Sequence, residues 1–202
     1  MNIESAKLID GFILNDELWW LALSAQRCQI VIEVGSWHGR SSCAIADNLP
    51  PKARLFCIDT WQGSISERET NHASAALLDG DHAFDQFCRN MFDHIATGRV
   101  IPLRMHSHHA AKLLMERSVR AELIFIDAGH EQDEVRSDIY DFLPLRAQGG
   151  ILSGHDYWHG DVPREIHHCP GVIKAVDEIF GNNVKLVPET SIWFTDDLLP
   201  AN

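Results

Sequence analysis

The chain has 202 residues, of which 45% are hydrophobic, and its formal net charge is −12. This length suits one domain with a full hydrophobic core, and the negative charge argues against a nucleic-acid substrate, because phosphate binding needs a positive surface. No apolar run approaches the ~20 residues of a membrane-spanning helix.

Helix and strand patterns alternate along the chain, beginning with a helix in the N-terminal segment 1–29, over residues 16–23. Helices are also predicted over residues 41–48, 84–95, 110–117, 131–143 and 172–180. Apolar runs predict strands over residues 30–34, 54–58, 100–103, 123–126, 151–153, 184–187 and 191–194. Alternation of this kind predicts an α/β fold. We expect a single Rossmann-like domain over residues 1–202, with a doubly wound, mostly parallel seven-stranded sheet and helices on both faces.

Polar side chains stand where the predicted strands end. They are Glu33, Asp59, the pair His106-Ser107, Asp127 and the pair His155-Asp156. In an open α/β sheet, ligands bind at the carboxyl ends of the strands, near the point where the strand order reverses. Acidic or imidazole groups at five strand ends therefore predict a ligand site at this edge of the sheet.

The segment after the first predicted strand is the most specific. It reads EVGSWHG from Glu33 to Gly39, and a helix begins near Ser41. Glycine lets the backbone approach a ligand and take positive φ, and a helix start offers free N–H groups to an anion. A dinucleotide site would instead have G-x-G-x-x-G, with its acidic residue on the second strand. One G-x-x-x-G with an acid before Gly35 favours S-adenosylmethionine and predicts a methyltransferase.

Five segments at family-like spacing carry a resemblance to known proteins. They are VIEVGSWHGRSS (31–42), CIDTWQG (57–63), IFIDAGH (124–130), GGILSGHDY (149–157) and PGVIKAV (170–176). On these segments the chain resembles the class I S-adenosylmethionine-dependent methyltransferases. It is most similar to the small-molecule O-methyltransferase branch, related to macrocin O-methyltransferases and cephalosporin-hydroxylase-like proteins. The resemblance implies methyl transfer to a hydroxyl of a small molecule, such as a sugar or another natural-product-like acceptor.

The resemblance also implies which residues bind S-adenosylmethionine. The first loop would contribute Glu33, Gly35, Ser36, Gly39 and Ser41; Asp59 and Thr60 would bind the ribose; His106 and Ser107 would contact the adenine; and Asp127 would lie beside the same ligand. The alternatives are a fold-stabilising or capping role for Glu33, an ordinary turn residue at Asp59, and an exposed loop at His106.

Two aspartates are candidates for a metal site. Asp127 and Asp156 end adjacent predicted strands, and two carboxylates in one cleft repel unless a cation lies between them. Oxygen ligands suit Mg²⁺ or Mn²⁺. Related families have an acidic pair where this chain has His155-Asp156, so His155 either ligates as a neutral imidazole or leaves the site short of a ligand. The alternative is that Asp156 caps a turn and no metal binds.

The catalytic base is predicted from a second departure. Some relatives carry an acidic base at the position of Gly129, and glycine cannot accept a proton. His130 follows it, and an ordinary histidine pKa near ~6.5 suits proton removal from a hydroxyl. A metal would lower the pKa of that hydroxyl. We therefore predict His130 and Asp127 as catalytic residues; the alternative for His130 is a residue that packs or caps the following helix.

Two polar segments, residues 61–85 and 157–169, are predicted to cover the acceptor as substrate lids. Trp19-Trp20 in the N-terminal helix could serve a homodimer, although core packing is the commoner fate of such a pair. The five cysteines show no C-x-x-C spacing, and the N-terminal residues lack a signal-peptide pattern. We therefore expect a cytoplasmic protein that begins near Met1 and has neither membrane nor nucleic-acid partners.

Three other functions compete with methyl transfer. A nicotinamide-dependent oxidoreductase is disfavoured by the missing third glycine and by the acid before Gly35. A non-catalytic domain that binds S-adenosylmethionine is favoured by the departures at Gly129 and His155. A hydroxylase-like or other metal-assisted activity is a third alternative, because fold does not dictate reaction.

Overall fold

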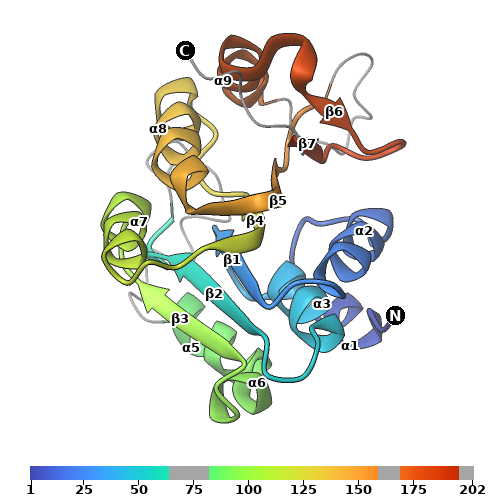
Figure 1. The fold of residues 1–202 in the computed structure, drawn as a ribbon. Helices are drawn as coiled ribbons and strands as arrows, with labels where there is room; N and C mark the ends of the chain where they lie inside the picture. Colours follow the sequence, from blue (N-terminus) through green and yellow to red (C-terminus); the bar gives the residue numbers. More distant parts are fainter. Residues whose placement is uncertain (64–81, 159–168, 196–202) are drawn as a thin grey trace.

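The computed structural model describes residues 1–63, 82–158 and 169–195. Its centre is a seven-stranded sheet with strand order β3-β2-β1-β4-β5-β7-β6 (Figure 1). The strands are β1 (Ile30–Val34), β2 (Arg54–Asp59), β3 (Val100–Arg104), β4 (Ala121–Ile126), β5 (Arg146–Gly154), β6 (Lys185–Leu186) and β7 (Trp193–Thr195). Strands β1 to β5 pair in parallel, whereas β7 is antiparallel to both of its neighbours. The predicted fold class is confirmed.

Helices cover both faces of the sheet (Figure 1). One face packs against α1 (Glu4–Lys7), α2 (Asn15–Ala25), α3 (Arg40–Asn48), α5 (His82–Asn90) and α6 (Phe92–Ala96). The other packs against α7 (Ser107–Glu116), α8 (Gln132–Phe142) and α9 (Pro170–Phe180). Alternate residues of β1 supply the two cores: Val31 packs on the first face, and Ile32 and Val34 on the second. This alternation follows from the two-residue period of a strand.

The strand register brings the chemically useful ends together. Val34 of β1 pairs with Ile58 of β2 on one side and with Ile126 of β4 on the other, and Ile126 pairs with Gly154 of β5. The residues that follow these strands therefore emerge side by side at one edge of the sheet. This edge is where the ligand site was predicted.

Three predicted elements differ from the observed ones. The helix predicted over residues 84–95 is two helices, because the backbone breaks at Met91 between α5 and α6. The fifth strand begins at Arg146, five residues before the predicted start. Gly149, with φ +73°, lies inside this strand. Helix α7 begins at Ser107, three residues before the start of the helix predicted over residues 110–117.

The predicted tryptophan pair of the N-terminal segment divides between surface and core. Trp20 packs on Phe194, with ring centroids 5.8 Å apart, whereas Trp19 is 41% exposed. The homodimer stays a prediction. Most of both predicted lids, residues 64–81 and 159–168, lies outside the described residues.

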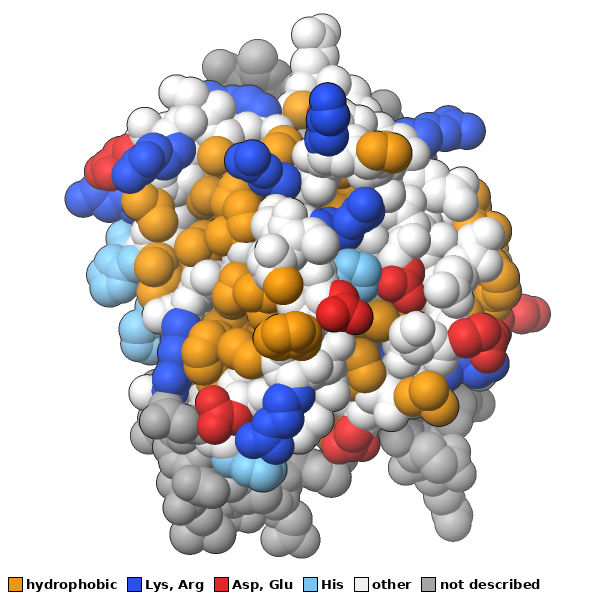
Figure 2. All heavy atoms as spheres, turned by 90° about the horizontal axis from the view of Figure 1, so that it is seen from below, with side chains coloured by type: hydrophobic (Ala, Val, Ile, Leu, Met, Phe, Trp, Pro, Cys, Tyr) orange, Lys and Arg blue, Asp and Glu red, His pale blue; other side chains and the backbone are white. Residues whose placement is uncertain are grey.

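None of the described helices is long and apolar enough to cross a membrane. Figure 2 shows the molecule from below the view of Figure 1. Most of the Lys and Arg side chains on this face lie in the upper half of the view, and most of the Asp and Glu side chains lie in the lower half and at the right.

Candidate functional site

Two glycines with positive φ shape the loop after β1. Gly35 has φ +88°, and a Cβ atom on it would lie 1.8 Å from the carbonyl oxygen of Asp127. Gly39 has φ +89° and is the N-cap residue of α3. Only glycine allows the loop to approach the end of β4 this closely. The structure therefore forms a tight loop where the first cofactor loop was predicted.

The carboxylate of Glu33 is buried beneath this loop. Its Oε2 accepts hydrogen bonds from the hydroxyls of Ser42 and Ser36, the latter at 2.7 Å. Burial raises the pKa of Glu33, and hydrogen bonds from Ser42, Ser36 and Ser41 oppose that rise. These contacts favour the fold-stabilising alternative, in which Glu33 supports the loop from inside and the serine hydroxyls face the protein.

Asp59, at the end of β2, joins two loops. Its Oδ2 accepts hydrogen bonds from the backbone N–H groups of Ser36 and Trp37, both at 2.9 Å, and its Oδ1 accepts one from Trp61 at 2.7 Å. Asp59 therefore holds the loop after β1 and the loop after β2 together, and its contact with a ribose stays a prediction.

Trp61 is part of this loop support, although the sequence placed it in a lid. Its side chain is fully buried, and its indole N–H donates to the carbonyl oxygen of Trp37 at 2.7 Å. The ring packs against Phe84 and Phe87 of α5. Trp61 has a positive φ of 54°, which is uncommon for a bulky residue. Nothing in the sequence indicated this backbone conformation.

A first pocket lies beyond the ends of β2 and β3. Its lining consists of Thr60, Gln62, Arg104, Met105 and His106. Thr60 and His106 were predicted to contact the cofactor, and the pocket brings them together. Arg104 was missed because no motif marks the end of β3; its guanidinium lies over the ring of Phe84, 4.9 Å from the centroid.

The hydroxyl of Ser107 contacts a neighbouring helix. Its hydroxyl forms a hydrogen bond with the buried Asp138 of α8. Burial raises the pKa of Asp138 to about 6, and the Ser107 hydrogen bond opposes the rise. The hydroxyl of Ser107 is thus engaged between two helices, and its adenine contact stays a prediction.

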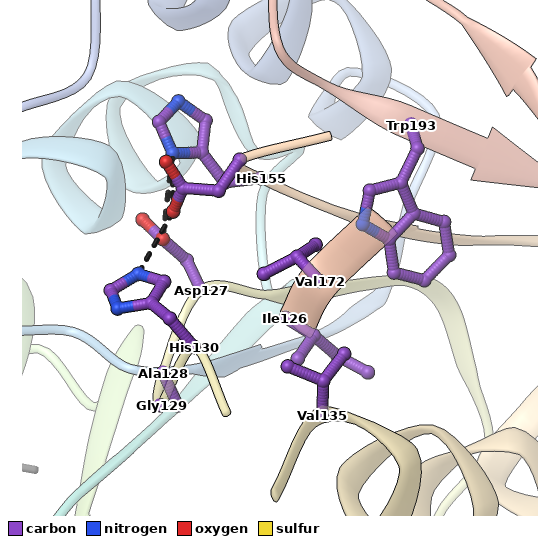
Figure 3. A pocket seen from close by; sticks show the side chains of 10 residues that line it. Ile126, Asp127, Ala128, Gly129, His130, Val135, His155, Val172 and Trp193 are labelled. Carbon is purple, nitrogen blue, oxygen red and sulfur yellow. Dashed lines mark ion pairs between the residues drawn. The ribbon is translucent and has the colours of Figure 1, made fainter. Parts of the chain in front are cut away.

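A second pocket lies at the ends of β4 and β5 (Figure 3). In Figure 3 the charged and imidazole groups, Asp127, His130 and His155, lie on one side, and the apolar side chains, Ile126, Val135, Val172 and Trp193, lie on the other. The pocket is small, with a volume of about 10 Å³, and its apolar side chains are 1–5% exposed, so its accessible groups are mainly the polar ones.

The polar side of this second pocket is a cluster of carboxylates and imidazoles. Nδ1 of His155 lies 3.3 Å from Oδ2 of Asp156 and 3.6 Å from Oδ1 of Asp127. The same oxygen of Asp156 lies 2.9 Å from Nε2 of His130. The residues predicted as metal ligands and as base therefore meet in one place.

Glu17 of α2 completes the cluster, and sequence reasoning missed it. Its Oε2 lies 3.0 Å from Nε2 of His155, off the line of an ideal hydrogen bond, so the contact is an ion pair. The backbone N–H of Leu14 donates to Oε2 at 2.8 Å, while the N–H and the hydroxyl of Ser191 both donate to Oε1 at 3.0 Å. A lone acid in the first turn of an N-terminal helix carries no sequence signal of such a role.

A protein-family model described as a methyltransferase domain matches residues 32–157. The chain belongs to this methyltransferase family. The matched region contains both loops joined by Asp59 and the loops that carry Asp127 and Asp156. The predicted class I methyltransferase resemblance is confirmed.

Solved methyltransferase structures share the fold. An O-methyltransferase from Bacillus cereus in complex with S-adenosylhomocysteine is 16% identical, with a TM-score of 0.64 over 96% of this chain and 87% of that chain. An O-methyltransferase from Streptomyces achromogenes, involved in tomaymycin synthesis and bound to S-adenosylmethionine, is 15% identical, with a TM-score of 0.62 over 95% and 85%. A TDP-rhamnose 3'-O-methyltransferase of calicheamicin biosynthesis is 17% identical, with a TM-score of 0.57 over 91% and 81%. No curated protein sequence matches the chain.

The carboxylates and the imidazole of His155 in the second pocket have strongly shifted pKa values. Burial opposes the charge of His155, but Asp156, Asp127 and Glu17 raise its pKa well above the ordinary value. Burial also opposes ionisation of Glu17, yet contacts with His155, Ser191 and Leu14 lower its pKa to about 2. The neighbouring carboxylates thus favour the protonated form of His155, and Glu17 is the carboxylate opposite its Nε2.

The two aspartates of the cluster differ from each other. Burial raises the pKa of Asp127 to about 7, although His155 and His130 pull it down. Burial would raise that of Asp156 too, but His155 and His130 outweigh it and hold its pKa well below the ordinary range. Asp156 is thus the carboxylate that stays ionised beside His130.

The predicted metal ligands lie close enough together for one ion, since the ligand atoms of Asp127, His155 and Asp156 lie within 4.8 Å of one another. Nδ1 of His155 faces Asp156 and Asp127, and its Nε2 faces Glu17. A metal-ligating imidazole commonly has its other ring nitrogen against a carboxylate, so this arrangement fits the predicted ligand set. Metal binding stays a prediction.

Proposed function

We propose that this protein transfers the methyl group of S-adenosylmethionine to a hydroxyl of a small molecule. The observation that carries the proposal is the tight loop at Gly35, which Asp59 holds beside the first pocket within a methyltransferase domain. The B. cereus and S. achromogenes enzymes of the same fold are O-methyltransferases crystallised with S-adenosylhomocysteine and S-adenosylmethionine. The acceptor class, a sugar or another natural-product-like hydroxyl compound, is part of the proposal.

His130 is proposed as the base that takes the proton of the acceptor hydroxyl. Its Nε2 is paired with Asp156 at 2.9 Å, and its ring lines the second pocket beside Asp127. An ionised Asp156 fixes the ring and stabilises the positive charge that forms on it. S-adenosylmethionine supplies a sulfonium methyl group, whose bond to sulfur breaks as the acceptor oxygen bonds to the carbon. The electron pair of the broken bond stays on sulfur.

The apolar side of the second pocket is proposed to hold the body of the acceptor. Val135, Val172 and Trp193 lie opposite Asp127 and His130 but are only 1–3% exposed, so an acceptor would reach them only if neighbouring side chains moved. Alignment of the acceptor with the methyl group contributes much of the rate, because in-line displacement depends on geometry. Assistance by Mg²⁺ or Mn²⁺ stays a prediction, and no step of this mechanism requires an ion.

Loss of the Asp59 carboxylate should abolish cofactor binding. For Asp59→Ala we expect the affinity for S-adenosylmethionine to fall by about 100-fold or more, since hydrogen bonds to a charged group contribute roughly 1.5–3 kcal/mol each. The measurement is calorimetric titration of S-adenosylmethionine and S-adenosylhomocysteine. Asp47→Ala is the matched control, because Asp47 is paired with His94 outside both pockets. If wild-type protein binds neither nucleoside, the proposed function is rejected.

Loss of the base should slow the reaction without affecting the cofactor. For His130→Gln we expect a rate lower by about 10²–10⁴, the usual contribution of a general base, with unchanged affinity for S-adenosylmethionine. The rate is measured as S-adenosylhomocysteine formed with a panel of hydroxylated acceptors. His108→Gln is the control, since His108 makes an equally short pair, 2.9 Å, with Asp141 on the surface. Equal rates for the two variants would remove His130 from the mechanism. If no acceptor of the panel is methylated, the non-catalytic alternative gains support.

A further inference from the structure

A thiol, a carboxylate and an imidazole meet between α3 and α6, outside both pockets. Cys43 and Asp47 lie one turn apart on α3, and His94 belongs to α6. One ligand atom from each of the three lies within 4.8 Å of the other two. None of the three residues lines either of the pockets described above. This α3–α6 cluster is therefore separate from the site proposed for methyl transfer.

The carboxylate of Asp47 stands between the other two groups. Its Oδ1 lies 2.9 Å from Nε2 of His94, and its Oδ2 lies 3.9 Å from Sγ of Cys43. In a tetrahedral zinc site, bonds of about 2.0–2.3 Å place neighbouring ligand atoms roughly 3.3–3.6 Å apart. The two measured separations differ from these values by only about 0.4 Å, so small side-chain rotations would bring the three groups around one ion.

The thiol of Cys43 is oriented differently from that of another buried cysteine. Sγ of Cys28 donates a hydrogen bond to the carbonyl oxygen of Ser24 at 3.2 Å. The thiol of Cys43 instead faces Asp47, at the longer distance of 3.9 Å, although the residue is only 3% exposed. A buried thiol that faces a carboxylate and an imidazole without a close partner is placed as a metal ligand would be.

The charge of the Asp47 carboxylate is not matched by a lysine or an arginine among the described residues. The nearby guanidinium of Arg99 donates to the carbonyl oxygens of Ala46 and Leu49 instead. The remaining contact of the carboxylate is with the side-chain amide of Asn2, at 3.4 Å. The side chains of Asp47 and His94 are 15% and 22% exposed, so an ion can reach them from solvent.

We propose that Cys43, Asp47 and His94 bind a zinc ion, with water as the fourth ligand. A thiolate and an imidazole suit Zn²⁺, whereas Mg²⁺ and Ca²⁺ prefer oxygen ligands alone. The thiolate and the carboxylate together balance the two positive charges of the ion, and the thiol proton leaves as the ion binds. The ion would join α6 to α3 and stabilise the fold. This inference is independent of the methyl transfer proposed above.

The first test is titration of metal-stripped, full-length protein with Co²⁺, which occupies zinc sites and absorbs in the near ultraviolet when a thiolate binds it. We expect this thiolate band to appear in wild type and to be lost in Cys43→Ser. Cys169→Ser is the control, because Cys169 lies beside His130 and Asp156 of the second pocket; it should keep the band. A wild type without the band overturns the proposal, and so does a band that survives in Cys43→Ser.

The second test leaves the buried thiol in place and measures thermal unfolding with Zn²⁺. At about 100 times its dissociation constant, Zn²⁺ should raise the unfolding temperature of wild type by about 5–10 °C. His94→Gln should lose most of this rise. His108→Gln should keep it, because His108 forms an equally short pair with Asp141, at 2.9 Å, outside the possible metal clusters of the described residues.

A wild type whose unfolding temperature does not respond to Zn²⁺ contradicts the proposal. The same holds for a His94→Gln protein that responds as strongly as wild type, since the His94–Asp47 contact would then be an ordinary ion pair. Titration of S-adenosylmethionine into the same proteins, with and without Zn²⁺, should give one affinity, because the cluster lies outside both pockets. That titration tests the proposed function separately.

Discussion

Gly35→Ala is expected to destabilise the protein and to abolish cofactor binding. The new Cβ atom would meet the carbonyl of Asp127 at 1.8 Å, and the residue would keep a φ of +88°. The left-handed backbone costs about 1–2 kcal/mol for a residue with a Cβ atom, and overpacking adds typically about 1–3 kcal/mol. We therefore expect the free energy of unfolding to fall by roughly 2–5 kcal/mol. The loop can relieve the clash only by moving away from β4, so its contacts to Asp59 change with it.

The measurements are urea unfolding and titration with S-adenosylmethionine. Gly98→Ala is a close control, because Gly98 also has positive φ, +71°, but a Cβ atom there meets nothing within 4 Å. The control should lose only the backbone contribution of about 1–2 kcal/mol and should bind the cofactor normally. A Gly35→Ala protein as stable as the Gly98→Ala protein would show that the loop does not need its contact with Asp127.

Removing the carboxylate of Glu17 is expected to lower the free energy of unfolding. Burial raises the pKa of Glu17, but contacts with His155 outweigh burial and lower this pKa from 4.5 to about 2. A carboxylate with a depressed pKa stabilises the fold above its unfolded pKa, and this stabilisation is lost as pH falls through the folded value. For Glu17→Gln we expect a loss of about 3 kcal/mol at neutral pH, which shrinks to about 1 kcal/mol near pH 3.

The measurement is the free energy of unfolding of wild type and Glu17→Gln at both pH values. Glu4→Gln provides the comparison, because the Glu4–Lys7 pair at 3.2 Å is exposed and should contribute about 0–1 kcal/mol. A difference between wild type and Glu17→Gln that is the same at both pH values would contradict the lowered pKa of Glu17, because every contact that lowers this pKa stabilises the fold in a pH-dependent way.

The sequence predicted the sheet and the place of the site because both depend on local patterns. Apolar runs mark the strands, and polar residues follow them at Asp59, Asp127 and Asp156. Parallel strands end at the same edge, so the pattern alone was enough to place residues that are distant in sequence close together. The glycine loop was likewise visible, although its contact with the Asp127 carbonyl was not.

The rest of the site depends on contacts that have no local signature. Glu17 reaches His155 and Ser191 across the fold, and no spacing rule connects the N-terminal helix with β5 and β7. For the same reason the sequence could suggest a metal between Asp127 and Asp156 but could not show a third carboxylate, that of Glu17, beside His155. The early start of β5 was missed because Gly149 and Gly150 are as typical of a turn as of an irregular strand.

The hydrogen bonds between Glu17 and Ser191 span 174 positions of the chain. The N-terminal helix leaves the ribosome early, whereas Ser191, which donates hydrogen bonds to the Glu17 carboxylate, is synthesised near the end of translation. Strand β7, which lies between β5 and β6, is also inserted late. The central strands can pair beforehand, but the acid–imidazole cluster is assembled only when the last strand docks. Nascent chains stalled before residue 191 would therefore carry the central strands without β7, and an acid–imidazole cluster without the Ser191 donors.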